Sequence, residues 1–279
     1  MKALVLDMDG TILDHSGRFP RSLVAVLAAL KERGMLIFFA TGRTHHEITK
    51  ITPEDCPLDG YVAASGMGVY VDGQLIDSAS FDPDFVADMI AAARRREIYY
   101  EIHTLENSSR TLLEDKEYSA ADISQPQPET MKHFEYLYAQ KTLESTVQWV
   151  PTLSLEHVVK IFFFSTDTHK IASWYDHLKT HQDESDYALY TTSVHNAEIM
   201  LKGRDKATGL ETLMIRYGLS YEDVHVVGDS MNDLPLFDKA GKRTAMKNSV
   251  PSILEAADDI TEYTCDEDGL SRYLASVYL

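Results

Sequence analysis

The stretch LVLDMDGTIL, residues 4–13, decides the fold of this chain. It is a short apolar run that ends in Asp7 and Asp9, followed by Gly10, and this predicts a buried strand whose carboxyl end opens a site. Neighbouring carboxylates at the rim of a core repel each other and lose solvation, so the pair makes sense if a cation lies between them. Magnesium favours carboxylate oxygen and leaves room for water and a substrate phosphate. The alternative interpretation of the pair is a solvated acidic turn.

Length and charge limit the classes of protein to consider. The 279 residues are enough for one large α/β domain, or for a core with a smaller second domain. A formal net charge of −18 argues against a nucleic-acid partner, although a metal and a few placed cations still allow a phosphorylated metabolite to bind.

Cysteine content and hydropathy indicate the compartment. The chain has two cysteines, Cys56 and Cys265, so no disulfide framework is predicted. Acids interrupt the first apolar run, and no stretch approaches the ~20 apolar residues of a membrane span. We therefore expect a soluble cytoplasmic protein without a membrane partner.

Strands and helices alternate along both ends of the chain. The apolar patterns predict strands at 35–40, 61–64, 225–228 and 243–246, a hairpin at 69–76, and helices at 22–33 and 206–217. Such alternation is typical of a parallel sheet with crossover helices. We predict an α/β fold with a Rossmann-like parallel sheet core and helices on both faces.

The sequence pattern changes in the middle of the chain. The patterns there predict helices at 83–97, 129–140 and 167–181, and strands at 98–105, 158–165 and 187–192. This stretch contains none of the strand-end acids found on either side of it. We therefore predict an inserted α+β cap domain at 82–192 and a catalytic core formed by 1–81 and 193–279, with a core strand at 197–200.

Two further strand ends carry residues suited to phosphate. Thr41 and Gly42 follow the second strand, where a hydroxyl and bare backbone N–H groups can bond phosphate oxygens and the glycine permits close approach. A simple turn before a capped helix is the alternative. Lys206 opens a helix whose first turn normally favours acids, so this lysine is electrostatically odd there, unless it is an ordinary surface lysine.

A later strand ends in the sequence GDSMND, residues 228–233. It places Asp229 and Asp233 on a strand-to-helix turn. Taken alone, these acids can be a helix cap and a first-turn acid. Beside Asp7 and Asp9 in the same sheet, they are expected to complete a magnesium site.

These four blocks, in this order, resemble the haloacid dehalogenase superfamily of phosphohydrolases, and most closely its Cof-like members, which carry a large α/β cap between the second and third motifs. Residues 7–11 match the first motif, 40–43 the second, 202–207 the third and 228–233 the fourth. The tail segments 245–249 and 268–270 are similar to the family's usual ending.

The resemblance implies a role for each motif residue. Asp7 would attack phosphorus and become an aspartyl-phosphate, and Asp9 would act as general acid and then general base. Mg²⁺ would be held by the Asp7 carboxylate, the Asp9 backbone carbonyl and Asp229, with Asp233 in support. The residues expected to hold the transferring phosphoryl group are Thr41, Gly42, Lys206 and Asn232. The implied activity is Mg²⁺-dependent hydrolysis of small phosphorylated metabolites, which we expect to be sugar phosphates.

One departure from the family concerns the rim of the site, where the substrate would make contact. We predict that this rim includes Arg43, Ser65 and Gly66. Cof-like proteins often carry Asn-Gly-Ala after the third strand, whereas this chain has Ser-Gly-Met at 65–67. The serine has a shorter reach and the methionine adds bulk, so substrate contacts at this rim differ from the family pattern.

Two other functions compete with a phosphatase. A phosphosugar mutase would need a second phosphate site in the cap, and the sequence shows no clustered arginines or lysines for it. A non-catalytic phosphometabolite-binding regulatory protein would not need both Asp7 and Asp9. Aromatic residues of the insert line a pocket for a ring-bearing ligand or simply form the core of the cap; they are Tyr99, Tyr100, His103, Tyr136, Tyr138 and Trp149.

Overall fold

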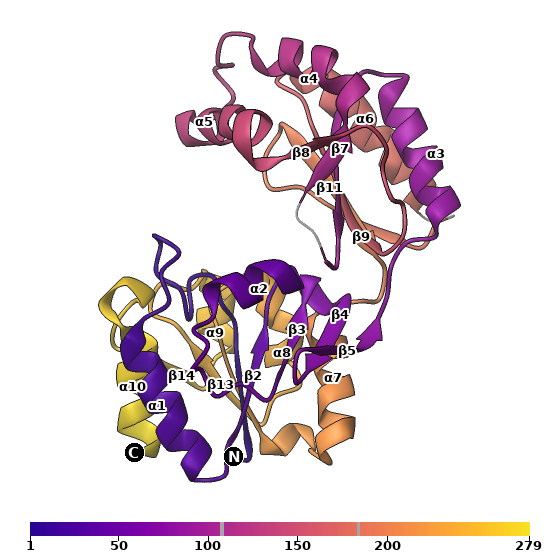
Figure 1. Ribbon diagram of the computed structural model, residues 1–279. Helices are drawn as coiled ribbons and strands as arrows, with labels where there is room; N and C mark the ends of the chain where they lie inside the picture. The colour runs from indigo at the N-terminus through magenta and orange to yellow at the C-terminus, as the bar shows by residue number, and fades with distance from the viewer. Residues whose placement is uncertain (107–108, 183–184) are drawn as a thin grey trace. The chain divides into compact units, whose positions relative to one another are not determined.

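The computed structural model describes residues 1–106, 109–182 and 185–279, and these form two units (Figure 1). The first unit comprises Met1–Ser78 with Arg204–Leu279, and the second comprises Ala79–Gly203. In the described part of the chain, no helix combines the length and the apolar character needed to cross a membrane.

The first unit is built on one sheet with the strand order β14-β13-β12-β1-β2-β3-β4-β5. Its strands are β1 (Ala3–Leu6), β2 (Leu36–Ala40), β3 (Gly60–Ala63), β4 (Gly68–Val71), β5 (Gln74–Ser78), β12 (Val224–Gly228), β13 (Lys242–Ala245) and β14 (Asp259–Ile260). From β14 to β3 all pairings are parallel, and the β4–β5 hairpin continues the sheet in antiparallel fashion. Parallel strands align their carboxyl ends, so the ends of β12, β1, β2 and β3 lie at one edge.

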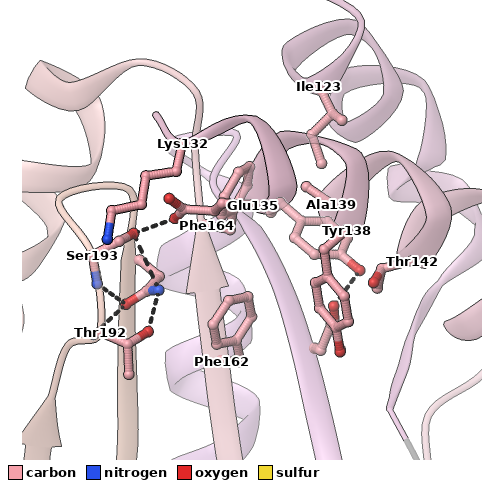
Figure 2. A pocket seen from close by; sticks show the side chains of 13 residues that line it. Ile123, Lys132, Glu135, Tyr138, Ala139, Thr142, Phe162, Phe164, Thr192 and Ser193 are labelled. Atoms are coloured by element: carbon pink, nitrogen blue, oxygen red, sulfur yellow. Dashed lines mark hydrogen bonds between the residues drawn. The ribbon is translucent and has the colours of Figure 1, made fainter. Parts of the chain in front are cut away.

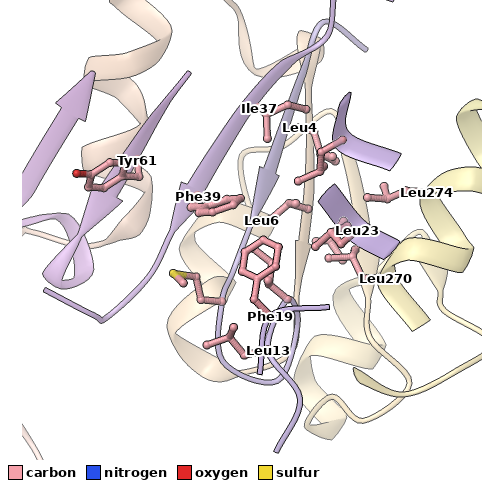
Figure 3. Close-up of a cluster of buried hydrophobic side chains, with 14 of the residues drawn as sticks. Leu4, Leu6, Leu13, Phe19, Leu23, Ile37, Phe39, Tyr61, Leu270 and Leu274 are labelled. Carbon is pink, nitrogen blue, oxygen red and sulfur yellow. The ribbon is translucent and has the colours of Figure 1, made fainter. Parts of the chain in front are cut away.

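Helices cover both faces of this sheet, and β1 shows why. Leu4 and Leu6 join a buried cluster with α1 and α10 (Figure 3), whereas Ala3 and Val5 join a second cluster with α7, α8 and α9. Alternate residues of a strand point to opposite faces, so a continuous apolar run is needed where both faces are covered. The helices of this unit are α1 (Arg21–Glu32), α2 (His45–Ile51), α7 (Lys206–Tyr217), α8 (Leu234–Phe237), α9 (Pro251–Ala256) and α10 (Gly269–Tyr278).

The second unit has its own mixed sheet with the order β10-β11-β9-β6-β7-β8. Its strands are β6 (Tyr99–Thr104), β7 (Arg110–Leu112), β8 (Gln148–Val150), β9 (Val158–Phe164), β10 (Tyr187–Tyr190) and β11 (Asn196–Leu201). Its helices are α3 (Pro83–Arg94), α4 (Lys116–Ile123), α5 (His133–Lys141) and α6 (Thr168–His181). Asp82 and Asp167 cap α3 and α6, since each side chain accepts two backbone N–H groups of the first turn.

The two faces of this second sheet differ. One face is a large apolar core in which Tyr100 and Phe163 of the sheet pack with α3 and with Trp174 of α6. On the opposite face, Tyr99 and Phe164 belong to a smaller buried cluster that includes Ile123 and Leu143. The large core holds the unit together, and the second face is less completely filled.

The predicted α/β fold with a parallel core sheet is confirmed, and the inserted α+β part has a mixed sheet of its own. One strand assignment is wrong. The strand predicted at 197–200 was assigned to the core sheet, but β11 pairs with β9 and β10 of the second sheet. Its inward-facing Ala197 and Ile199 fit either sheet, so hydrophobic pattern alone does not choose between them. The extent of the cap, 82–192, stays a prediction. Five short elements that the patterns did not indicate are α4, β7, β8, α9 and β14.

Candidate active site

The loop after β1 positions the first two acids at the strand-end edge. The Asp7 N–H donates to the carbonyl oxygen of Val227 at 3.0 Å, which extends the pairing with β12 by one residue, and Asp7 is only 3% exposed. Gly10 has φ +77°, and a Cβ there would lie 2.4 Å from an oxygen of Asp229. A glycine is therefore required for the loop to pass the Asp229 carboxylate.

The turn after β12 brings in two more acids. Asp233 lies in the short 3₁₀ helix Met231–Asp233, and its Oδ2 accepts the backbone N–H groups of Asp229 and Ser230 at 3.0 and 3.1 Å. Asp233 is fully buried and Asp229 is half-buried. The sequence at this turn therefore does two things at once, because it caps the turn and directs a second carboxylate oxygen toward the site.

Lys206 supplies the cation of the cluster. It is the first residue of α7, whose capping residue Asp205 accepts the Thr208 N–H at 2.8 Å. Lys206 is fully buried, and its Nζ donates to Asp7 Oδ1 at 2.5 Å and to Asp233 Oδ1 at 2.7 Å. The alternative of an ordinary surface lysine is excluded by this burial.

Three carboxylates therefore converge on one point. Asp7, Asp229 and Asp233 each offer an oxygen, and these oxygens lie within 4.8 Å of one another. Among the described residues, Lys206 is the one cation paired with this group, through Asp7 and Asp233, so about two negative charges are left uncompensated. A buried set of hard oxygen donors with this charge suits a divalent cation such as Mg²⁺.

The pKa values of the clustered residues reflect the same excess of negative charge. Burial raises the pKa of Asp7 well above its ordinary value; Lys206 lowers it, and the Asp233 and Asp229 carboxylates raise it again. Burial and the Asp233 carboxylate raise the pKa of Asp229 to about 6. Burial alone would lower the pKa of Lys206, but Asp7 and Asp233 raise it overall, so the ammonium stays charged. A metal would compete with protons for these carboxylates.

The loop after β2 carries Thr41, Gly42 and Arg43. Thr41 is fully buried, and its Oγ1 accepts the Arg43 N–H at 3.2 Å, so the hydroxyl proton remains available for a ligand. The Arg43 guanidinium donates to both carboxylate oxygens of Asp9, at 2.5 and 2.8 Å. The Asp9 side chain is 59% exposed, and it faces Arg43 rather than joining the three converging carboxylates.

The predicted rim residues lie next to this loop. The Ser65 N–H donates to the Thr41 carbonyl at 2.9 Å, and Ser65 adopts a left-handed φ of +53°. Gly66 has φ +98°, and a Cβ there would lie 2.1 Å from the Asp205 carbonyl oxygen. Gly66 therefore fixes the approach to the start of α7, where Lys206 begins.

The structure thus brings Asp7, Asp229, Asp233 and Lys206 together in one cluster, in which Lys206 contacts Asp7 and Asp233. Asn232 lies exposed on the turn of Asp233, and its Oδ1 accepts the Ser230 hydroxyl at 2.9 Å. The roles assigned to these residues, and to Thr41, Gly42 and the Asp9 carbonyl, stay predictions at this point.

Two supporting residues were not singled out by sequence reasoning. The buried Thr11 hydroxyl donates to Asp229 at 3.3 Å. The Asn248 amide donates to the Gly10 carbonyl at 2.8 Å, and its Oδ1 accepts the Cys265 N–H at 3.0 Å. Thr11 lies in the segment that matches the first motif of the family, and Asn248 lies in the tail segment that is similar to the family's ending. These two matches were the signal in the sequence that could have identified them.

Comparison with known proteins identifies the family of this chain. The family model for haloacid dehalogenase-like hydrolases matches residues 4–274. The chain is 25% identical over 288 residues to the 5-amino-6-(5-phospho-D-ribitylamino)uracil phosphatase YwtE of Bacillus subtilis (strain 168), covering 98% of this chain and 97% of the relative. It is 24% identical over 287 residues to the phosphatase YwpJ of the same organism, covering 98% and 99%.

Solved structures share the fold. A haloacid dehalogenase-like hydrolase from Bacteroides thetaiotaomicron superposes with a TM-score of 0.77 at 19% identity, covering 99% of both chains. A sugar phosphatase of subclass IIB of the same superfamily superposes with a TM-score of 0.69 at 23% identity, again covering 99% of both chains.

Proposed function

We propose that this chain, which belongs to the haloacid dehalogenase-like hydrolases, is a Mg²⁺-dependent phosphatase that acts on small phosphorylated metabolites. The observation that carries the proposal is the buried cluster of Asp7, Asp229 and Asp233 around the Lys206 ammonium. Relatives that match along nearly their whole length are phosphatases by name, which supports the same reaction class.

In the proposed first step, an Asp7 carboxylate oxygen attacks phosphorus and the bond to the leaving oxygen breaks. Asp9 donates a proton to that leaving oxygen. In the second step, Asp9 takes a proton from water while the water oxygen attacks phosphorus, and the bond from phosphorus to Asp7 breaks. Inorganic phosphate leaves, and both aspartates return to their starting states.

The surrounding residues orient the reactants. Lys206 fixes the Asp7 carboxylate through a 2.5 Å hydrogen bond and places a positive charge where negative charge develops on the phosphoryl oxygens. The free hydroxyl proton of Thr41, the backbone at Gly42 and the Asn232 amide are proposed to hold those oxygens. Arg43 pairs with Asp9 in the absence of substrate, so substrate phosphate would compete with Asp9 for this guanidinium.

The donor set fits a hard divalent cation. Asp7 and Asp229 are proposed as carboxylate ligands and the Asp9 carbonyl as a third, with Asp233 in support. When bound, Mg²⁺ would neutralise part of the charge on the phosphoryl oxygens and lower the repulsion between them and Asp7.

The substrate class is proposed from the sequence and the relatives together. Sugar phosphates are the class expected from the sequence, and one structural neighbour is a sugar phosphatase. The relative YwtE is named for a phosphorylated ribitylamino-uracil. A screening panel should therefore contain both simple sugar phosphates and phosphates of ring-bearing compounds.

The test is phosphate release from p-nitrophenyl phosphate and this panel, with and without Mg²⁺. Wild type is compared with Asp7→Asn and with Asp238→Asn, which changes an exposed carboxylate outside the cluster. We expect Mg²⁺-dependent release that Asp7→Asn reduces to background and Asp238→Asn leaves unchanged. Full activity in Asp7→Asn, or no release of phosphate from any compound by a folded wild-type protein that binds Mg²⁺, would refute the proposal.

A further inference from the structure

A cavity of about 690 Å³ lies entirely within the second unit (Figure 2). Its walls come from α4, α5, β6, β9, β11 and the turn between β10 and β11, on the sheet face opposite α3 and α6. Small-molecule sites typically measure ~300–1,000 Å³, so this cavity has the size of a ligand site.

Aromatic rings form most of its apolar wall. Tyr99 and Phe164 are register partners on adjacent strands, and Phe162 lies two residues before Phe164 on the same face. Tyr138 contributes from α5, and although it is a large aromatic side chain it is 68% exposed. Ala139 of α5 adds only a methyl group beside it, which leaves space next to the rings. Such walls suit a planar ligand that stacks on them.

A buried carboxylate lies on the sheet side of the cavity. Glu101 is 6% exposed, and its Oε1 accepts the Tyr99 hydroxyl at 2.8 Å, while His103 Nε2 lies 3.5 Å from its Oε2. Burial alone would raise the pKa of Glu101, but the hydrogen bond and charge of His103 and the hydrogen bonds of Tyr99 and Ser109 lower it below its ordinary value, which favours the ionised form. A buried carboxylate in a ligand cavity favours a partner with N–H or amino donors.

Most of the other polar lining residues lie near the start of α5, namely Lys132, Glu135, Thr192, Ser193 and Asn196, whereas Thr142 lies just beyond its end. Glu135 accepts the Ser193 hydroxyl (Figure 2), and the amide of Asn196 on β11 donates to the same Ser193 oxygen at 3.3 Å. Lys132 is the one cationic side chain in the described lining, against the carboxylates of Glu101 and Glu135. The lining is therefore acidic overall, so it disfavours a phosphate or carboxylate group, including the second phosphate that a phosphosugar mutase would have to bind.

The distribution of polar groups also separates a ring from a polyol. A polyol presents hydroxyls on all sides, and several of them would be left without partners against the aromatic walls. A flat ring presents apolar faces that match Phe162, Phe164 and Tyr138, and it carries donors only at its edge, which the carboxylates of Glu101 and Glu135 in the same lining would accept.

We infer that this cavity binds a planar aromatic or heteroaromatic ring that carries N–H or amino donors on its edge and no negative charge. The same chemistry can come from two sources, the organic part of a phosphorylated substrate or a separate unphosphorylated ligand. The first source rests on the phosphatase function proposed above, whereas the cavity's preference for a ring does not.

Two variants of the full-length protein test the cavity, each with a matched control on α5. Ala139→Trp fills the space beside the rings, and Tyr138→Ala removes an exposed ring whose loss leaves the core intact. Leu137 is 49% exposed on the same helix and is not part of the lining, so Leu137→Trp and Leu137→Ala serve as controls. Circular dichroism and thermal melting confirm that each variant is folded.

The direct measurement is calorimetric titration with pyridoxamine and adenine as ring probes and ribitol as the polyol probe. We expect a ring probe to bind wild type, with at least tenfold weaker binding in Ala139→Trp and Tyr138→Ala and less than twofold change in the controls. The inference is overturned if neither ring binds, if ribitol binds as tightly as the rings, or if the cavity variants behave like their controls.

A kinetic measurement then identifies the source of the ring. It compares kcat/KM for pyridoxamine 5′-phosphate with kcat/KM for acetyl phosphate, which carries no ring. A tenfold loss in Ala139→Trp for the first compound alone assigns the cavity to the substrate. Unchanged kinetics together with weakened pyridoxamine binding assign it to a separate ligand. If wild type releases phosphate from neither of these compounds nor from any member of the panel above, the proposed function fails, and the calorimetric result still decides the cavity.

Discussion

Replacing Asp229 by asparagine should destroy the proposed metal site and yet stabilise the metal-free protein. Burial and the Asp233 carboxylate raise the pKa of Asp229 from 3.8 to about 6. A carboxyl whose pKa is higher in the folded than in the unfolded chain costs stability once it ionises. This rise corresponds to about 3 kcal/mol, and because Asp229 is only half-buried, screening by water reduces the expected gain to about 1–3 kcal/mol.

The pH dependence gives this prediction its sharpest test. The loss of stability caused by ionising Asp229 is absent below about pH 4, grows as the pH rises to about 6 and stays constant above that value. Urea unfolding in EDTA should therefore show a stability advantage of Asp229→Asn that appears between these pH values and then stays constant. Asp238→Asn, at an exposed carboxylate, should show no such advantage. In Mg²⁺ at ~1,000 times Kd the order should reverse, because binding then stabilises wild type by about 4.1 kcal/mol, which exceeds the gain of the variant. An Asp229→Asn protein that is less stable than wild type in EDTA at pH 7.5 would refute this reasoning.

Three further predictions concern other parts of the first unit. Gly66→Ala should destabilise the protein by about 2–4 kcal/mol in urea unfolding and lower activity, because its Cβ meets the Asp205 carbonyl at 2.1 Å and its φ is +98°. Arg43→Ala should change stability by less than ~1 kcal/mol, since its pairing with Asp9 is partly exposed, but should raise KM for phosphate esters in steady-state assays. Burial lowers the pKa of His225 to about 3, so stability should fall as the pH falls from about 6.5 toward 3, and His225→Gln should flatten that part of the unfolding profile.

The contacts of the charged cluster could largely be anticipated from the sequence. Asp7, Asp229 and Lys206 stand where parallel strands end or a helix begins, and the parallel order of β12, β1 and β2 brings those ends to one edge. What the sequence did not show is that Asp9 pairs with Arg43, because an exposed side chain can choose among several partners. The supporting bonds of Thr11 and Asn248 were also missed, since they depend on how loops fold back.

The second unit was harder to anticipate. Its large core follows from strong apolar strands such as 158–165, but β7 and β8 are only three residues long and carry little pattern. Of the aromatic residues considered for a pocket, Tyr99 and Tyr138 line the cavity, whereas Tyr100 points into the apolar core. Neighbouring residues of one strand face opposite sides, so this division depends on which face the helices cover.

The loss of folding stability caused by the charged cluster should be confined to the first unit, and the tryptophans of the chain make this measurable. Each unit has its own hydrophobic cores, and Asp7, Asp229, Asp233 and Lys206 all belong to the first. Units with separate cores can unfold separately. Both tryptophans of the chain, Trp149 and Trp174, lie in the second unit, so their fluorescence reports that unit alone.

Mg²⁺ should therefore shift the unfolding transition seen by far-ultraviolet circular dichroism and leave the fluorescence transition in place. A ring ligand in the cavity should instead shift the fluorescence transition. Equal shifts of both signals with Mg²⁺ would mean that the two units unfold as one, and the charge imbalance at the proposed metal site would then affect the stability of the whole chain.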